Sequence, residues 1–222
     1  MDEKGLENYI LFFRKGGSIQ TFSGIIYHPL DPRPEDINLV DVAHSLANTS
    51  RFTGHCRTHY STGEHAVRVS WRVRDNGGTL MQQYVALHHD DSDAYLPDVP
   101  TPLKVLPEFE WFRLIEKSNQ EACFQAFGCV VDDYSIIKKA DTELLLTEKR
   151  DLMPLRNGNW KIKYKESPIP RPYQIIPWTT EEVKQRYIER HNELVHSLSL
   201  SLPQSFHFRR LQYNIGTEFP GF

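Results

Sequence analysis

The chain has 222 residues, of which 39% are hydrophobic and 25% are charged, and its formal net charge is -3 at pH 7. These values exclude a disordered chain and indicate a globular protein, with a single domain as the first expectation for this length. The acidic balance provides no basic field for a nucleic-acid backbone, so an anionic ligand would need a local cluster of cations.

The cysteines and the apolar runs indicate the cellular compartment in which the protein is expected. The chain has 3 cysteines and no C-x-x-C pair, which argues against a disulfide framework and favours a reducing environment. The first residues are acidic and lack the apolar core of a signal peptide, and no run approaches the roughly 18 apolar residues of a membrane helix. We therefore expect a cytoplasmic protein that acts away from membranes.

The first third of the chain predicts a small β-ribbon followed by a helix. Residues 8–28 contain two apolar runs on either side of Gly16-Gly17, which is a turn signal. A proline-rich loop comes next, and residues 37–47 then show helical spacing. The polar and irregular segment 51–62 is expected to be a loop.

The middle of the chain predicts helices with recognisable ends. Ser61 and Glu64 fit the S-x-x-E capping box, which opens a helix, and Thr79 can cap the next one. Gly128 is a natural helix end. The helices are expected at residues 61–74, 80–96, 108–127 and 133–153.

After Pro154 the pattern changes to a short hairpin and an extended, proline-rich strap at residues 156–177. A last helix is expected from Thr179 or Thr180 to about Ser197, followed by a weakly patterned tail. The expected organisation is therefore an N-terminal β-ribbon and loop at 1–34, a helical core at 35–153, and a strap, helix and tail at 154–222.

Four residues stand out as candidate metal ligands on predicted inward faces: His65, His89, Asp90 and Asp141. A buried carboxylate is costly unless it has a cation, hydrogen-bond donors or a shifted pKa. Two imidazoles and two carboxylates from separate helices could meet around one divalent ion; this donor set suits Zn, Mn, Fe or Co, while Mg prefers more oxygen. The alternative for any single histidine is a satisfied core or surface residue, and we expect this of His44, His55, His59 and His88.

Three motifs resemble those of one enzyme superfamily. The run ALHHDDSDAYLPDVPTPLK at 86–104 resembles A-L-L-H-D-A-x-E-A-Y-x-x-D-x-P-x-P-x-K, the core motif in the nucleotidase branch of HD-domain phosphohydrolases. STGEHAV at 61–67 resembles the S-V-A-E-H-S-V segment of that family, and KKADTELLLTEKRDLM at 138–153 resembles its A-D-x-x-x-x-x-x-E-R-x-x-L-M helix. Segments 19–55 and 175–194 are similar to phage and prophage members, so the resemblance covers nearly the whole chain.

The resemblance implies a mainly α fold, with an HD-domain helical bundle, and a role for each matching residue. The implied metal ligands are His65, His89, Asp90 and Asp141, the implied catalytic carboxylates are Asp93 and Asp98, and the implied substrate-binding residues are Arg51, Phe52, Pro102 and Lys104. Arg51 and Lys104 would hold phosphate, whereas Phe52 and Pro102 would border the base or sugar. Asp93 replaces a usual Glu that works with the activated water or protonates the leaving group, and Asp91 replaces a usual small residue. Because the shorter Asp93 reaches less far, Asp98 could take over the acid/base role.

The implied activity is hydrolysis of a small deoxynucleotide with a divalent metal, which could be Zn, Co, Mn or Mg. The phage-like N-terminal segment favours a dATP triphosphohydrolase, as in phages that replace adenine with diaminopurine; a 5′-deoxynucleotidase acting on monophosphates is the alternative. A non-catalytic nucleotide-binding module, favoured by the change at Asp93, and a cyclic-nucleotide or alarmone hydrolase also stay open. Related enzymes form homo-oligomers, and the helix around Trp111 could supply an interface or pack in the core.

Overall fold

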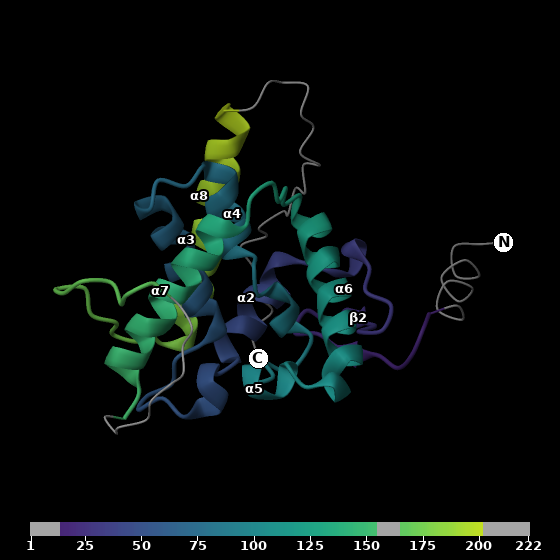
Figure 1. Ribbon diagram of the computed structural model, residues 1–222. Coiled ribbons are helices and arrows are strands. Elements are labelled where there is room, and N and C mark those ends of the chain that lie inside the picture. The colour runs from purple at the N-terminus through teal and green to yellow at the C-terminus, as the bar shows by residue number, and fades with distance from the viewer. Residues whose placement is uncertain (1–13, 155–164, 202–222) are drawn as a thin grey trace.

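Helices dominate the described part of the chain, residues 14–154 and 165–201 of the computed structural model (Figure 1). The fold is mainly α with a small two-stranded antiparallel sheet near the N-terminus, which confirms the predicted fold class. The predicted C-terminal hairpin falls largely on residues 155–164, and the predicted tail on residues 202–222, outside the described residues. The α-helices are α2 (Leu39–Asn48), α3 (Thr62–Asp75), α4 (Leu80–Leu87), α5 (Thr101–Lys104), α6 (Glu110–Phe127), α7 (Ser135–Leu152) and α8 (Thr180–Ser201). Short 3-10 turns are η1 (Pro34–Asp36), η2 (Arg51–Gly54), η3 (Asp91–Ala94) and η4 (Pro107–Phe109).

The sheet of the described residues is a short two-stranded hairpin. Its strands β1 (Ile19–Gln20) and β2 (Ile26–Tyr27) pair Ile19 with Tyr27 and Gln20 with Ile26. The turn lies at residues 21–25, where the Thr21 amide donates to the Ile25 carbonyl at 2.9 Å and Gly24 has a φ of +92°. The predicted turn at Gly16-Gly17 would pair this run with residues 9–13, which lie outside the described residues; the described pairing turns inside the second apolar run.

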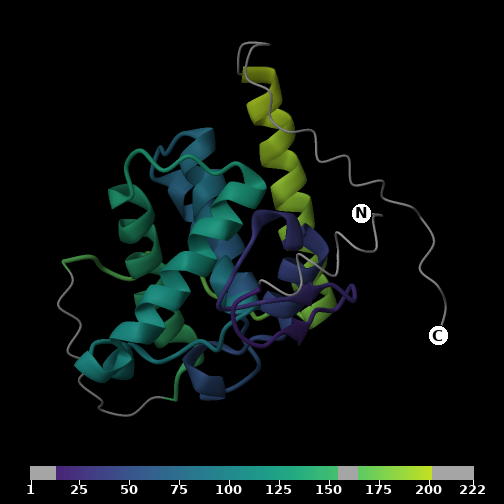
Figure 2. The same ribbon diagram turned by 90° about the vertical axis from the view of Figure 1, so that its right-hand side faces the viewer.

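Helix α3 lies at the centre of the bundle and packs against α2, α4, α7 and α8. Figure 2 shows α8 standing beside α2, and α8 also packs against α4. Every residue from 61 to 70 is buried, including charged ones, so the polar side chains of α3 need partners inside the protein. Among the described residues, no helix has the length and apolar character required to cross a membrane.

The predicted helix caps are present, with one difference. The Ser61 side chain accepts a hydrogen bond from the Glu64 amide at 3.1 Å, as expected for the start of α3. The Glu64 carboxylate, however, binds Arg68 and the amide of Trp178 (2.9 Å) instead of closing the box. Glu64 thereby ties the strap before α8 to the central helix.

Helix α4 ends at Leu87, nine residues before its predicted end at 96. Side chains from distant helices lie against the carbonyls at this end: the Tyr187 hydroxyl oxygen lies 3.1 Å from the Leu87 carbonyl oxygen, and the Gln120 amide donates to the His88 carbonyl at 2.7 Å. The chain then turns into η3. This break exposes the side chains of His89 and Asp90 to the space between α3 and α7.

Candidate metal centre

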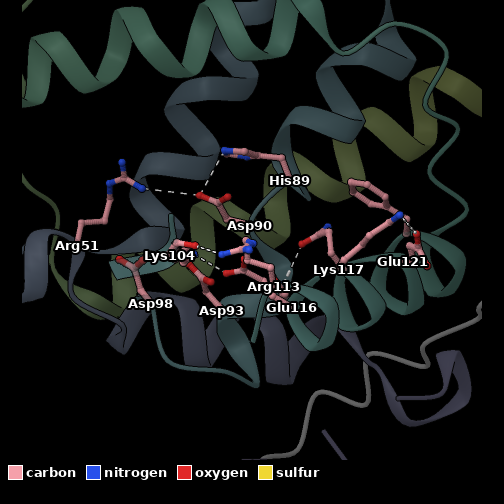
Figure 3. A pocket seen from close by; sticks show the side chains of 13 residues that line it. Arg51, His89, Asp90, Asp93, Asp98, Lys104, Arg113, Glu116, Lys117 and Glu121 are labelled. Atoms are coloured by element: carbon pink, nitrogen blue, oxygen red, sulfur yellow. Dashed lines mark hydrogen bonds and ion pairs between the residues drawn. The ribbon is translucent and has the colours of Figure 1, made fainter. Parts of the chain in front are cut away.

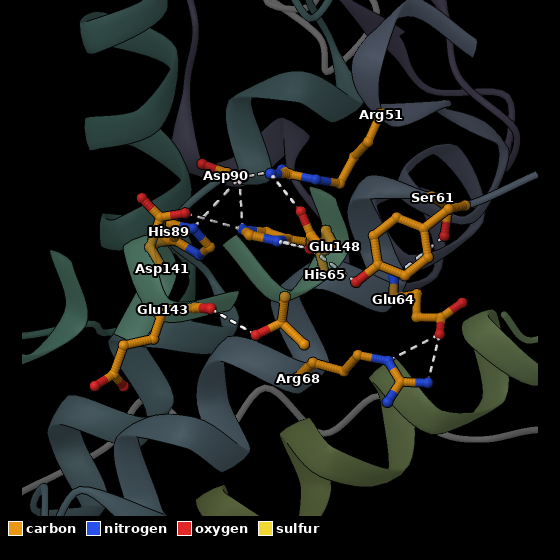
Figure 4. Close-up of polar contacts among 12 residues, drawn as sticks. Arg51, Ser61, Glu64, His65, Arg68, His89, Asp90, Asp141, Glu143 and Glu148 are labelled. Carbon is orange, nitrogen blue, oxygen red and sulfur yellow. Dashed lines mark hydrogen bonds and ion pairs between the residues drawn. The ribbon is translucent and has the colours of Figure 1, made fainter. Parts of the chain in front are cut away.

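Side chains from three segments meet between α3 and α7 (Figure 4). His65 comes from α3, His89 and Asp90 from the break after α4, and Asp141 from α7. One ligand atom each from His65, His89 and Asp141 lies within 4.8 Å of the other two, a spacing that could hold a metal ion. The Asp90 Oδ2 lies beside them, 3.3 Å from His89 Nε2 and 3.9 Å from His65 Nε2.

The two histidines are held in the orientation that metal binding needs. His65 Nδ1 lies 2.6 Å from Glu148 Oε1, and His89 Nδ1 lies 2.8 Å from the Ala86 carbonyl, so both Nδ1 atoms donate hydrogen bonds. Each Nε2 is then left with its lone pair toward the shared space. His65 Nε2 is buried and makes no hydrogen bond within the described ranges. This buried nitrogen, 3.3 Å from Asp141 Oδ1, and the mixed imidazole and carboxylate donors fit a first-row divalent ion.

Glu148 supports the centre and was not predicted from the sequence as a site residue. It is fully buried on α7, where it accepts hydrogen bonds from His65 and from the Tyr60 hydroxyl (2.8 Å), and it lies 3.3 Å from Arg51. Burial alone would raise its pKa, but Arg51 and His65 outweigh burial and lower the pKa to about 2. Glu148 lies seven residues after Asp141, about two helical turns away, so helical periodicity could have placed it on the same face.

The charge balance of the centre favours a cation. Burial and Arg51 act to lower the pKa of His65, but the carboxylates of Glu148 and Asp141 outweigh them and raise it to about 9. Burial would raise the pKa of Asp141, but His65, His89 and Lys138 hold it well below its usual range. In the absence of a metal, a proton on His65 therefore supplies the positive charge that these carboxylates require.

A cleft of about 440 Å³ opens beside the centre (Figure 3). It is lined by His89 and Asp90 of the centre and by four more predicted site residues, namely Arg51, Asp93, Asp98 and Lys104. One face of α6 forms another wall with side chains that the sequence did not single out: Arg113, Glu116, Lys117, Gln120, Glu121 and Phe124. Their spacing of three and four residues is that of one helix stripe, which is the signal that could have found them.

Two predicted substrate-binding residues do not line this cleft. Phe52 has a φ of 53° and its ring lies 5.5 Å from the guanidinium carbon of Arg51, whereas Pro102 is exposed on α5. The aromatic side chain that lines the cleft is Phe124 of α6. Any flat ring bound there would meet Phe124 rather than Phe52.

Asp93 has the properties of a proton donor. Burial raises its pKa to about 8, Asp90 and Asp98 act in the same direction, and Lys104 opposes them. The ammonium of Lys104 bonds to Glu116 across the cleft. Asp93 therefore holds its proton at neutral pH next to the candidate ligand Asp90.

The remaining histidines that we assigned to packing or solvent lie outside the centre. His59 bonds to Ser50 (3.0 Å) and the Ala47 carbonyl (3.1 Å), His44 stacks on Phe22, and His55 is exposed. His88 is buried and pairs with Asp91 at 2.6 Å.

The fold and site define a helical protein with a histidine and aspartate cluster that could hold a metal ion. No protein-family profile matches the chain. The chain is 32% identical to the uncharacterized protein YfdR of Escherichia coli K12 over 177 residues, which cover 79% of this chain and 94% of YfdR. It is also 38% identical to an uncharacterized protein of Rhodobacter capsulatus over 79 residues, or 34% of this chain and 40% of that protein. The chain therefore belongs to the family of YfdR.

Proposed function

We propose that this protein is a metal-dependent phosphohydrolase of the HD-domain type that acts on deoxynucleotides. The observation that carries the proposal is the meeting of His65, His89 and Asp141, with Asp90 beside them, at the edge of a cleft that also contains Arg51 and Lys104. Metal ligands, cations and a proton donor in one cleft are the parts that phosphate ester hydrolysis requires.

His65, His89, Asp90 and Asp141 would hold the ion, which could be Zn, Co, Mn or Mg. When bound, such an ion supplies Lewis-acid activation of water and of the phosphoryl group. Glu148 keeps His65 in the tautomer that leaves Nε2 available.

The charged residues of the cleft would bind the phosphate and manage the protons. The Arg51 guanidinium, 3.7 Å from Asp90, lies at the metal end and would donate charge-assisted hydrogen bonds to phosphoryl oxygens. Lys104 adds another cation in the cleft. Asp93 would protonate the leaving oxygen, while Asp98 helps to keep that proton in place by its charge.

A nucleoside would extend from the metal end along α6. Phe124 offers a flat apolar face for a base, and Gln120 and Glu121 offer polar groups beside it. Our leading candidate is dATP, cleaved to deoxyadenosine and triphosphate, because segment 19–55 is similar to phage members. The 5′-deoxynucleotidase activity is the second candidate, because the motif at 86–104 resembles that of the nucleotidase branch.

We also propose that the protein forms a homo-oligomer. Trp111 and Leu114 at the start of α6 are 61% and 64% exposed, and Val105, between α5 and α6, is 68% exposed. Such a patch favours burial against a second copy. Light scattering should give a mass of at least two chains for the wild type, and Trp111→Lys should shift the mass toward that of one chain. A monomeric wild type would contradict the proposed homo-oligomer.

A nucleotide panel tests the proposed function. The purified protein is stripped of metal, loaded with Mn, Co, Mg or Zn, and incubated with each dNTP, each dNMP and ATP, with products separated by chromatography. Deoxyadenosine and intact triphosphate from dATP alone would support the leading candidate, and nucleosides from monophosphates alone would support the second. No turnover, or equal turnover by Asp90→Ala, would refute the enzyme assignment and favour a non-catalytic nucleotide-binding module.

A further inference from the structure

The break between α4 and η3 contains a second buried polar pair that the proposed chemistry does not use. His88 and Asp91 are both 0% exposed, and His88 Nδ1 lies 2.6 Å from Asp91 Oδ2. In the chain they stand on either side of His89 and Asp90, the residues that turn toward the metal centre. Their side-chain hydrogen bond thus links the two residues that flank the candidate ligands in the chain.

The pair is a joint departure from the motif that the chain otherwise resembles. Where that motif reads A-L-L-H-D-A, this chain reads A-L-H-H-D-D, so a Leu and an Ala are replaced by His88 and Asp91. A buried histidine or aspartate is costly without a partner. His88 and Asp91 bond to each other, so each gives the other the polar partner that its burial requires.

Two other helices complete this cluster. Tyr187 of α8 donates to the Asp91 carboxylate, and His191 Nδ1 of the same helix lies 3.0 Å from His88 Nε2. Gln120 of α6 bridges the break, since its amide donates to the His88 carbonyl at 2.7 Å and its oxygen accepts from the Ser92 amide at 3.1 Å. Helices α6 and α8 therefore hold the backbone on both sides of His89 and Asp90.

The cluster is a hydrogen-bonded support and not a second metal site. Both ring nitrogens of His88 already have partners, and the candidate metal group found among the described residues is the one formed by His65, His89 and Asp141. A closed, buried network of this kind restrains the backbone to one conformation.

We propose that His88 and Asp91 are positioning residues, which hold the backbone turn that directs His89 and Asp90 toward the metal. The proposal rests on the proposed metal centre. It predicts that the turn is already formed before metal binds, and that disturbing the pair weakens metal binding even where the fold persists. Residues that orient ligands typically change metal affinity by about 10- to 100-fold when altered.

The test measures the dissociation constant for Mn by calorimetry and the melting temperature, in the wild type and four variants. Asp91→Ala and His88→Leu each leave one member of the pair buried without its partner, and each should weaken Mn binding at least about 10-fold. The double variant His88→Leu/Asp91→Ala removes both polar groups and should bind Mn more tightly than either single variant. Arg190→Met is the control, because Arg190 is a buried residue of α8 that bonds to Ser70 and Gln83 away from the break; it should lower the melting temperature with Mn affinity unchanged.

Unchanged Mn affinity in a folded Asp91→Ala, or equal weakening in Arg190→Met, would overturn the proposal. If the wild type bound no divalent metal, the proposed function itself would fail, and the inference with it. Amide hydrogen exchange of the metal-free wild type provides a measurement that needs no variant. Slow exchange at residues 88, 91 and 92, unaltered by Mn, is expected, and rapid exchange that slows only on Mn addition would also overturn the proposal.

Discussion

Replacing Glu148 by Gln perturbs the metal centre without changing any of the proposed metal ligands. Glutamine keeps the shape of the side chain and one acceptor oxygen, but it removes the charge that faces His65 and Arg51. His65 would lose the carboxylate that fixes its tautomer. We expect both the stability of the metal-free protein and its metal affinity to fall.

The magnitude can be worked out in two ways. The pKa of Glu148 falls from the usual 4.5 to about 2, so the folded state favours the ionised carboxylate. At about 1.4 kcal/mol for each pH unit, that preference is roughly 3 kcal/mol; it is present above pH 4.5 and lost as the pH falls toward 2. Breaking a buried charged pair by removing one partner costs about 3–5 kcal/mol, which agrees at its lower end. For a chain of this size, a loss of about 3 kcal/mol lowers the melting temperature by roughly 6–12 °C.

The assay combines thermal unfolding of the metal-free protein at pH 7 with Mn titration by calorimetry. Mn affinity should fall by about 10- to 100-fold, as for other partners of metal-bound histidines. Glu143→Gln is the matched control: Glu143 lies on the same helix and is buried, but it bonds to Arg72 (2.6 Å) and Asn76 (3.0 Å) away from the centre. Glu148→Gln with Mn affinity within threefold of the wild type, or an equal loss in Glu143→Gln, would refute the reasoning.

Three further outcomes are expected. If Asp93 is the proton donor, turnover should fall as the pH rises through about 8, where Asp93 loses its proton. The Asp93→Asn variant should turn over slowly and lack this decline. Measured pH–rate profiles check both points, and a variant with the wild-type profile would contradict the assignment. Lys104→Met should raise the KM for nucleotide by about 10-fold or more through loss of a charged contact, with Mn affinity unchanged; unaltered steady-state kinetics would exclude the phosphate contact. Gly63→Ala should lower the unfolding free energy by about 1–3 kcal/mol, because a Cβ there would lie 2.9 Å from Val183 Cγ1 and 3.2 Å from the Ala47 nitrogen. Denaturant titration measures this change, and an unchanged midpoint would show that α8 can move aside.

The sequence predicted the parts of the site that depend on local patterns. His65 lies in a helix that begins at a predicted cap, and Asp141 lies on the buried stripe of another helix, so their inward direction follows from helical periodicity. Their meeting with His89 was expected both from the inward faces of the helices and from the family resemblance, and the structure brings these side chains together.

What the sequence did not predict depends on contacts between distant segments. The helical pattern continues past Leu87, but α4 ends there, where Tyr187 and Gln120 from distant helices contact the carbonyls of Leu87 and His88. The charged stripe of α6 resembles an ordinary solvated face, and only the packing of η3 and α5 against α6 makes it a wall of the cleft. His88 was expected to be structural or exposed; its bond to Asp91 is local, but its burial depends on α8.

The most direct test of the central claim is the number of divalent ions bound by each chain, measured together with turnover of the preferred nucleotide. We predict that metal-stripped protein binds Mn at the centre formed by His65, His89, Asp90 and Asp141, and that hydrolysis returns in proportion to the Mn bound. Asp141→Asn should lose both properties while staying folded. Hydrolysis by the metal-stripped protein, or full Mn binding and turnover by Asp141→Asn, would contradict the account.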